Sequence, residues 1–374
     1  MLIEFHILKS YPPTNLNRDE TGSPKSCFFG GVQRGRISSQ CLKHTWRRSE
    51  AFHELNLGIR TRYLPELVAE ELKNRGIQQD YLEIVRKKIS GLGNKETKET
   101  EDGRSTEQIM FFSAEDVQAV ADIVEAKINS CTNVKEVKEL KVKDWQNSLK
   151  GSAKVRPITL DIALFGRMIT DDSFADTEAS IQVAHAVSTN RVNMESDFFT
   201  AVDDLNKLYS NDSGSAMMGD TDFNSCCYYI YASLDTDQLL SNLESSPDAV
   251  QNAKDLIPIL IETMAFSNPS GKQNSFGGNV YPSVICVEVK DRKIPISYVN
   301  AFEIPVNSNG GKGLIRQSSD KLAHEIDNFD KTFGLDISER YWFSAVDSDC
   351  PNQPINPVQL SKSSFRLNIC FAFL

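Results

Sequence analysis

Strand-like sequence brackets a long helical stretch in this chain, and this arrangement limits the folds available to it. Residues 2–8 alternate apolar and polar side chains, which is the period of a half-buried strand. Further strand-like stretches, rich in β-branched and aromatic residues, lie at 158–165, 225–234 and 281–289. The sequence therefore predicts an α+β fold, one layer of sheet with helices on one face, interrupted by a helical insertion over residues 60–155.

The predicted insertion contains two amphipathic helices separated by a polar run. One apolar stripe is formed by Tyr81, Ile84, Val85, Ile89 and Leu92, and a second by Val117, Val120, Ala121, Val124 and Ile128. Residues 94–108 between them carry no apolar period, which is typical of a solvated linker. Two later helices are expected, one at 249–266, where Pro258 should kink or divide it, and one at 315–333.

Length and composition indicate a globular protein of two or more domains. The chain has 374 residues, of which 40% are hydrophobic, and no apolar run long enough to cross a membrane. Its first residues, MLIEFHIL, lack the pattern of a signal peptide. The eight cysteines include no Cys-x-x-Cys pair, so free thiols and a cytoplasmic location are expected.

A basic island stands out because the chain as a whole is acidic, with a formal net charge of −10. Residues 30–48 hold five Lys or Arg side chains and no acid, and they follow an irregular, Pro- and Asn-rich stretch at 9–35. Such an island needs an anionic partner nearby, which makes nucleic acid the first hypothesis. The alternative is a solvated basic helix face beside a glycine turn.

The island also carries backbone features that suit phosphate. Ser38 is a good N-cap for a helix whose first amides would be free to bind an anion. Gly30 and Gly31 lack a Cβ and would let a phosphate approach the main chain closely. Lys43 and Arg47 lie one helical turn apart and can follow adjacent phosphates. These would be backbone contacts, which do not read base sequence.

Motifs for catalysis or metal binding are not found in the sequence. It contains no P-loop, no Gly-x-Ser-x-Gly and no His-Glu-x-x-His, so no cofactor and no metal are expected. His185 is the best placed histidine for a metal or a general base, although a partly buried structural role is more common. The acid pairs Asp171–Asp172 and Asp203–Asp204 could hold a divalent ion, but adjacent acids are more often exposed.

Several sequence words point to one family. The segments LNRDETGSPK (16–25) and FFGGVQRGRISSQCLKHTWRRS (28–49) resemble the start of the backbone subunit of the type I-E CRISPR Cascade, the CasC family of the RAMP superfamily. Further agreements are LDIALFGRM (160–168), ASIQVAHAVSTNRV (179–192), DFFTAVDDL (197–205), GKQ (271–273) and NAFE (300–303). The similarity spans most of the chain and is weak only over 60–155 and in the tail.

This resemblance implies a hand-shaped fold. Its palm is a modified RRM/ferredoxin-like sheet, its fingers are an inserted helical domain, and its thumb is an extended β-hairpin. In this sequence the palm would take residues 1–58, a strand at 179–189, and residues 225–374. The fingers would take residues 59–178, and the thumb would take residues 190–224.

The resemblance also implies which residues contact a CRISPR guide RNA. Contacts with its backbone are expected from Arg18, Lys25, Gly30, Gly31, Arg34, Arg36, Ser38, Gln40, Lys43, Arg47, Arg167 and Lys272. Met168 is expected to wedge between bases. Phe198, where the family can carry Trp, and Phe199 would lie near a displaced nucleotide or, alternatively, pack within the thumb or against a neighbouring copy. Val32 and Gln33 stand where the family often has a basic residue, so one phosphate contact is expected to be weak or missing.

The implied role is non-catalytic, and the implied partners are the guide RNA, the target DNA strand, other Cascade subunits and further copies of this chain. The copies would oligomerise along the guide spacer and present it for pairing with DNA in antiviral defence. One alternative is a metal-dependent RNA endonuclease of the related type III kind, with Asp19 or Glu20 as the catalytic acid. A second alternative is a structural protein whose basic island binds an acidic protein.

Overall fold

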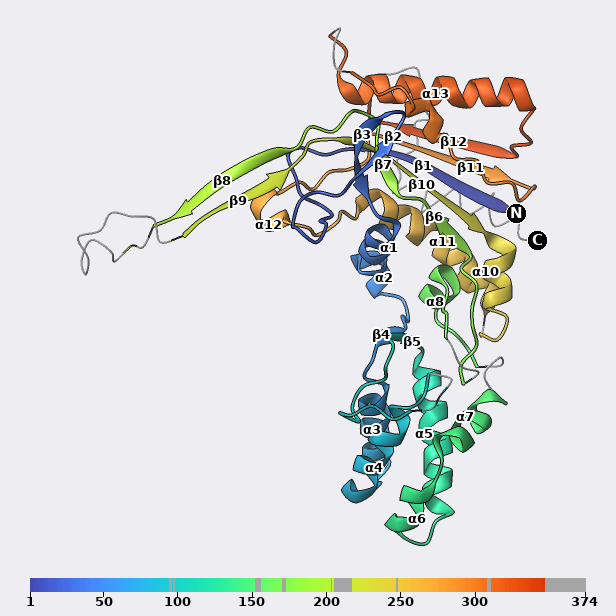
Figure 1. Cartoon of the computed structure of the whole chain (residues 1–374). Coiled ribbons are helices and arrows are strands. Elements are labelled where there is room, and N and C mark those ends of the chain that lie inside the picture. Colours follow the sequence, from blue (N-terminus) through green and yellow to red (C-terminus); the bar gives the residue numbers. More distant parts are fainter. Residues whose placement is uncertain are drawn as a thin grey trace.

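The computed structural model describes residues 1–93, 96, 98–151, 156–169, 173–202, 204, 217–246, 248–307 and 311–346. Within these ranges a central antiparallel sheet has helices on both of its faces. A helical body lies beneath one face, and a long two-stranded hairpin projects to the side (Figure 1). The predicted mixed α+β class is confirmed.

The central sheet has eight strands in the described part of the chain, in the order β12-β11-β1-β10-β7-β3-β2, with β6 also pairing with β10. These strands are β1 (Leu2–Ser10), β2 (Ser26–Phe29), β3 (Val32–Ile37), β6 (Ile181–Val183), β7 (Ala186–Ser188), β10 (Cys227–Asp235), β11 (Val284–Lys290) and β12 (Glu339–Ser344). β1 pairs antiparallel with β10 on one side and with β11 on the other. The three strands predicted at 2–8, 225–234 and 281–289 are therefore confirmed as neighbours at the centre of the sheet.

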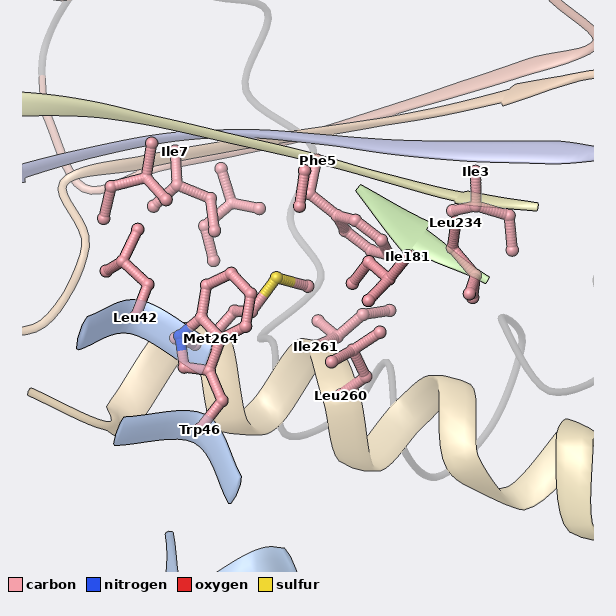
Figure 2. Close-up of a cluster of buried hydrophobic side chains, with 14 of the residues drawn as sticks. Ile3, Phe5, Ile7, Leu42, Trp46, Ile181, Leu234, Leu260, Ile261 and Met264 are labelled. Atoms are coloured by element: carbon pink, nitrogen blue, oxygen red, sulfur yellow. The ribbon is translucent and has the colours of Figure 1, made fainter. Parts of the chain in front are cut away.

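One face of the sheet packs on helices α1 (Ser39–Arg47) and α11 (Ala249–Phe266), with α2 (Glu50–His53) and α10 (Thr236–Asn242) beside them. The residues that meet here are Ile3, Phe5, Ile7, Leu42, Trp46, Ile181, Leu234, Leu260, Ile261 and Met264 (Figure 2). Leu42 and Trp46 share one side of α1 because they are four residues apart. Burying each such side chain contributes about 1.5–3 kcal/mol, so this core fixes the position of α1 under the sheet.

The opposite face of the sheet is covered by α13 (Leu314–Phe333) and the 3-10 turn η1 (Val299–Phe302) (Figure 1). Glu4 and His6, the polar half of the alternation in β1, are fully buried there. His6 Nδ1 lies 2.8 Å from the Tyr229 hydroxyl, and Glu4 forms an ion pair with Lys290. The prediction of helices on one face only was wrong, because ion pairs and hydrogen bonds satisfy these polar groups in place of water.

The helical insertion folds around a core of its own. Its elements are β4 (Ile59–Thr61), α3 (Leu64–Asn74), α4 (Gln79–Ile89), β5 (Met110–Phe112), α5 (Ala114–Asn129), α6 (Val134–Glu139) and α7 (Val142–Lys150). Both predicted apolar stripes pack into this core. Of the predicted linker, residues 94, 95 and 97 lie outside the described residues. Thr106 is fully buried and its N–H donates to the carbonyl of Arg62 at 2.7 Å, so the rest of the segment belongs to the folded body.

The projecting hairpin consists of β8 (Glu195–Ala201) and β9 (Met217–Phe223), paired antiparallel. Asn15 Nδ2 donates to the Asp222 carbonyl at 2.8 Å, and the Ser23 hydroxyl donates to Asp222 Oδ2 at 2.6 Å. Phe276 of α12 (Gln273–Phe276) packs against Phe223. The stretch at 9–35, predicted to be irregular, thus anchors the base of the hairpin, and its second half forms β2 and part of β3.

Two further predictions differ from the structure. Residues 160–165 form helix α8 (Leu160–Phe165) where a strand was predicted, because a short apolar run is compatible with either element. The helix ends at Gly166, which has a positive φ of +81°. Helix α11 continues through Pro258 and is not divided. α13 confirms the helix predicted at 315–333. The C-terminal tail, 347–374, lies outside the described residues.

Candidate nucleic-acid interface

The first turn of α1 is held by its own N-cap and by side chains from two other segments. The Ser38 hydroxyl accepts from the Cys41 N–H at 3.3 Å, which confirms Ser38 as the N-cap. The Ser38 N–H donates to Asn17 Oδ1 at 2.9 Å, and the Ser39 N–H donates to His185 Nδ1 at 3.1 Å. The start of the helix is therefore fixed before any ligand binds.

Positive charge gathers beside this turn. Arg36 of β3 lies opposite Val187 of β7, next to His185. Burial, then Arg36 and Lys25, lower the pKa of His185. Burial raises the pKa of the Cys41 thiol and Lys25 opposes that shift, which puts Lys25 near the same turn. No ion pair involves Lys25, Arg36 or Lys43 in the described part of the chain.

Lys43 and Gln40 follow on the same helix. Gln40 is exposed, and Lys43 is half-buried, which lowers the pKa of its amine through loss of solvation. A half-buried amine without an acidic partner favours a nearby anion, because the anion replaces the lost solvation. Lys25, Arg36 and Ser38 thus lie near the first turn of α1, and Gln40 and Lys43 follow on the same helix.

Arg34 faces inward, contrary to what a phosphate contact requires. Its side chain is 0% exposed, and its guanidinium donates to the carbonyls of Ser188, Thr189, Phe302 and Glu303 at 2.7–3.0 Å. Burial lowers the pKa of Arg34, while Cys27 and Cys226 oppose that shift. Through both terminal nitrogens, Arg34 ties β3 to β7 and to η1.

Arg47 is also engaged within the protein. Its Nε donates to Asp161 Oδ2 at 2.7 Å, another nitrogen contacts the Gly58 carbonyl, and its guanidinium lies 4.5 Å from the Phe111 ring centroid. The side chain points from α1 to the joint with the helical body. Arg47 thus forms an ion pair within the protein while Lys43 forms none among the described residues, and the predicted phosphate contact of this pair stays a prediction.

Arg167 is likewise buried and forms an ion pair with Asp116 of α5. Its Nε donates to the Ala175 carbonyl at 2.9 Å, and Nη1, which pairs with Asp116, also lies 3.3 Å from the Phe111 carbonyl. Next to it, Met168 is 86% exposed. The two neighbouring residues therefore differ in their surroundings. Arg167 is anchored to Asp116 in the interior, and Met168 is exposed on the surface.

The Gly30–Gly31 turn between β2 and β3 has positive φ angles of +58° and +75°. A Cβ on Gly30 would lie 1.9 Å from the carbonyl oxygen of Glu303, whereas nothing lies within 4 Å of a Cβ on Gly31. Gly30 is therefore required by close packing against Glu303. The Gly31 backbone remains open on its outer side.

Arg18 lines a pocket beside α1, and Lys272 directly follows Gly271 of the same pocket. Arg18 is exposed and lines a polar pocket of about 610 Å³ with Asp19, Glu20, His44 and Ser270. Lys272 has a left-handed backbone, φ +50°, directly after Gly271, which packs against the carbonyls of Asn15 and Leu16. Arg18 forms a β-bridge with Pro24, and the Lys25 N–H donates to the carbonyl of Asn17 at 2.8 Å, so Arg18 lies near Lys25.

Exposed apolar side chains mark the hairpin. Phe198 is 66% exposed on β8, while the ring of the neighbouring Phe199 packs over Gly219 of β9. Met194, Val202, Met217 and Met218 add to the exposed apolar surface. Phe199 is nevertheless 40% exposed, so its expected place near a displaced nucleotide stays a prediction beside its packing within the hairpin.

Asp19 caps its own turn. Its Oδ1 accepts from the Thr21 N–H at 2.9 Å, the Thr21 hydroxyl at 2.7 Å and the Ser23 N–H at 3.1 Å. These hydrogen bonds, that of the Thr21 hydroxyl first, lower the pKa of Asp19. No group of three or more His, Cys, Asp or Glu side chains that could hold a metal ion occurs among the described residues. Asp171, Asp172 and Asp203 lie outside them.

The hydrogen bond to His185 was not predicted from the sequence as part of this interface. The β6–β7 turn brings His185 to α1 across 146 residues, and no local pattern encodes that pairing. In the described ranges, no helix has both the length and the apolar character of a membrane span.

The chain is similar to known proteins over nearly its whole length. A family model described as CT1975-like protein, with the short name Cas_CT1975, matches residues 3–367. A solved structure described as "CRISPR RNA-guided surveillance complex, pre-nicking" aligns with a TM-score of 0.82 and 24% identity, covering 100% of both chains. Another, described as "CRISPR RNA-guided surveillance complex", aligns with a TM-score of 0.59 and 21% identity over 96% of both chains. Curated protein sequences give no significant match. The structural similarities show a shared fold.

Proposed function

The chain belongs to the CRISPR-associated family described as CT1975-like protein, and from this premise we propose that it is a non-catalytic subunit that binds a CRISPR guide RNA. Copies of it would oligomerise along the guide spacer and present the guide for pairing with a target DNA strand, within a type I-E Cascade. Its RRM-like palm would be the central sheet with α1, its fingers the helical body, and its thumb the β8–β9 hairpin.

The observation that carries this proposal is the unpaired positive charge at the start of α1. Lys25, Arg36 and Lys43 have no acidic partner in the described structure, although the chain as a whole has a net charge of −10. Other buried or half-buried cations, such as Arg47 and Arg167, form ion pairs with carboxylates. A cluster left unpaired in an acidic protein fits an anionic ligand, and a phosphate backbone supplies repeated anions at short spacing.

The set of residues proposed to contact the guide backbone is therefore smaller than the set expected from the sequence. Direct backbone contacts are assigned to Lys25, Arg36, Ser38, Gln40 and Lys43, with the Gly31 main chain, Arg18 and Lys272 at the flanks. Arg34, Arg47 and Arg167 act as positioning residues, and so does Gly30, because each fixes a segment that carries a contact. These residues would contact sugar and phosphate groups, so the base edges of the guide would stay available for pairing with DNA.

Two exposed apolar features fit the rest of the role. Met168 stands on the surface beside the anchored Arg167, as a side chain that separates stacked bases must. The exposed apolar side chains of the hairpin, including Phe198, Met217 and Met218, form a surface of the kind that another copy of the chain would cover. Self-association would then bring the hairpin of one copy over the guide held by its neighbour.

Co-expression with a guide RNA tests the proposal. The purified protein should carry RNA, visible as excess absorbance at 260 nm, and native mass spectrometry should show several copies on one RNA. A Lys25→Ala, Lys43→Ala double variant should lose most of this RNA while staying folded. Protein that purifies free of RNA, with the guide expressed, would contradict the proposal. Cleavage of matched RNA with Mg²⁺, abolished by Asp19→Ala, would overturn its non-catalytic part.

A further inference from the structure

His185 makes a contact with α1 that depends on its protonation state. The Ser39 N–H donates to Nδ1 of the ring at 3.1 Å, so the neutral ring accepts at Nδ1 and carries its proton on Nε2. Protonation would place a second N–H at Nδ1, facing the Ser39 N–H. The hydrogen bond would then be lost, and the main-chain N–H of Ser39 would be released.

The charged groups that face His185 are all cations. Arg36 comes from β3 and Lys25 from the segment before β2, and after burial they are the causes that lower the pKa of His185. The element packed against the ring, α1, presents only main-chain and hydroxyl groups there, from Ser38 and Ser39. No described carboxylate forms an ion pair with the ring. These cations therefore favour the neutral form of His185 while the cluster is empty.

We infer that His185 is a positioning residue that takes up a proton when a phosphate of the guide RNA binds at the start of α1. This inference rests on the proposed function and adds that binding of the guide is coupled to the uptake of one proton. A phosphate beside the cluster offsets the charges of Arg36 and Lys25, which favours the imidazolium form. The proton comes from solvent and is bound at Nδ1. The released Ser39 N–H and the new Nδ1–H then both become donors for the phosphate.

The sign of the effect follows from this linkage. Because the bound state holds one more proton than the free state, guide affinity should rise as the pH falls through the pKa values of the free and bound ring. Each unit by which the phosphate raises the pKa of His185 strengthens binding by about tenfold at acid pH. A merely structural histidine would give no such difference.

The test compares wild type with His185→Asn, because the Asn Oδ1 can accept from the Ser39 N–H but does not titrate. A labelled single-stranded RNA of mixed sequence is bound to the whole protein at constant ionic strength, between about pH 8 and pH 5.5. Wild type should gain about tenfold in affinity across this range, and His185→Asn much less. Calorimetry in two buffers of different ionisation enthalpy should show proton uptake in wild type only.

His324→Asn, an exposed histidine of α13 on the opposite face of the sheet, is the matched control and should keep the wild-type profile. Identical pH profiles for wild type and His185→Asn, with RNA still bound, would overturn the inference and leave the proposed function standing. No RNA binding at any pH would instead overturn the proposed function.

Discussion

Arg47 Nε donates a 2.7 Å hydrogen bond to Oδ2 of Asp161, a carboxylate that is fully buried. The other oxygen of this carboxylate accepts from the Gly58 N–H at 3.0 Å and from the Thr159 hydroxyl at 2.6 Å. Asp161 therefore joins the end of α1 to the chain that enters the helical body and to the start of α8. Within the basic island, Arg47 therefore stabilises the fold, whereas Arg36 and Lys43 carry charge that is unpaired among the described residues.

Removing Arg47 should destabilise the protein. Arg47→Ala leaves the buried Asp161 carboxylate without its ion-pair partner, which typically costs about 3 kcal/mol. Urea unfolding followed by circular dichroism should show this loss, whereas Lys43→Ala, one turn away and unpaired, should change stability by less than about 0.5 kcal/mol. Equal unfolding midpoints for the two variants would show that the Asp161 contact does not matter.

Removing Lys43 should weaken guide binding without regard to base sequence. Lys43→Ala takes away one phosphate contact, so the slope of log affinity against log salt should decrease by about 0.7. Anisotropy titrations with several unrelated RNA sequences over a salt series would measure both effects. Lys331→Ala, an exposed lysine of α13 on the far face of the sheet, serves as the control. A loss confined to particular sequences would contradict a backbone contact.

The two glycines of the β2–β3 turn should respond differently to alanine. Both have positive φ, which alone costs an alanine about 1 kcal/mol. Gly30→Ala additionally drives a Cβ into the Glu303 carbonyl, at 1.9 Å, so the turn and η1 must separate, while Gly31→Ala meets no neighbour. Thermal unfolding should show a loss for Gly30→Ala of at least about twice that for Gly31→Ala. Similar losses would mean that only the backbone conformation matters.

Local patterns predicted much of this fold. The alternation in β1, the Ser38 N-cap and the stripes of α4 and α5 are encoded within a few residues, and the structure confirms them. The resemblance to a CRISPR-associated family is confirmed as well, while the type I-E assignment stays a prediction. The matched sequence segments point to a candidate interface as a whole, without indicating which side chain points where.

The direction of each arginine could not be predicted in the same way. Arg34, Arg36 and Arg47 occupy one short basic segment, yet Arg34 binds carbonyls 154 to 269 residues away and Arg47 binds a carboxylate 114 residues away. Only Arg36 remains unpaired. Such partners come from tertiary contacts, which have no period in the sequence. For the same reason the sequence does not indicate that α13 covers the face of the sheet in which Glu4 and His6 are buried.

The network beneath α13 should make stability sensitive to acid. Burial acts to raise the pKa of Glu288, but His6, Arg340 and Lys290 outweigh it and lower the pKa from 4.5 to about 2. Because the folded pKa is the lower one, this stabilisation is present above about pH 4.5 and is lost as the pH falls toward 2. The loss amounts to roughly 3 kcal/mol. Denaturant unfolding across this range should show a steep decline in wild type and a shallower one in Glu288→Gln, which starts from lower stability at neutral pH. Glu262→Gln, an exposed change on α11, should keep the wild-type slope. A Glu288→Gln slope equal to that of wild type would show that other carboxylates dominate acid unfolding.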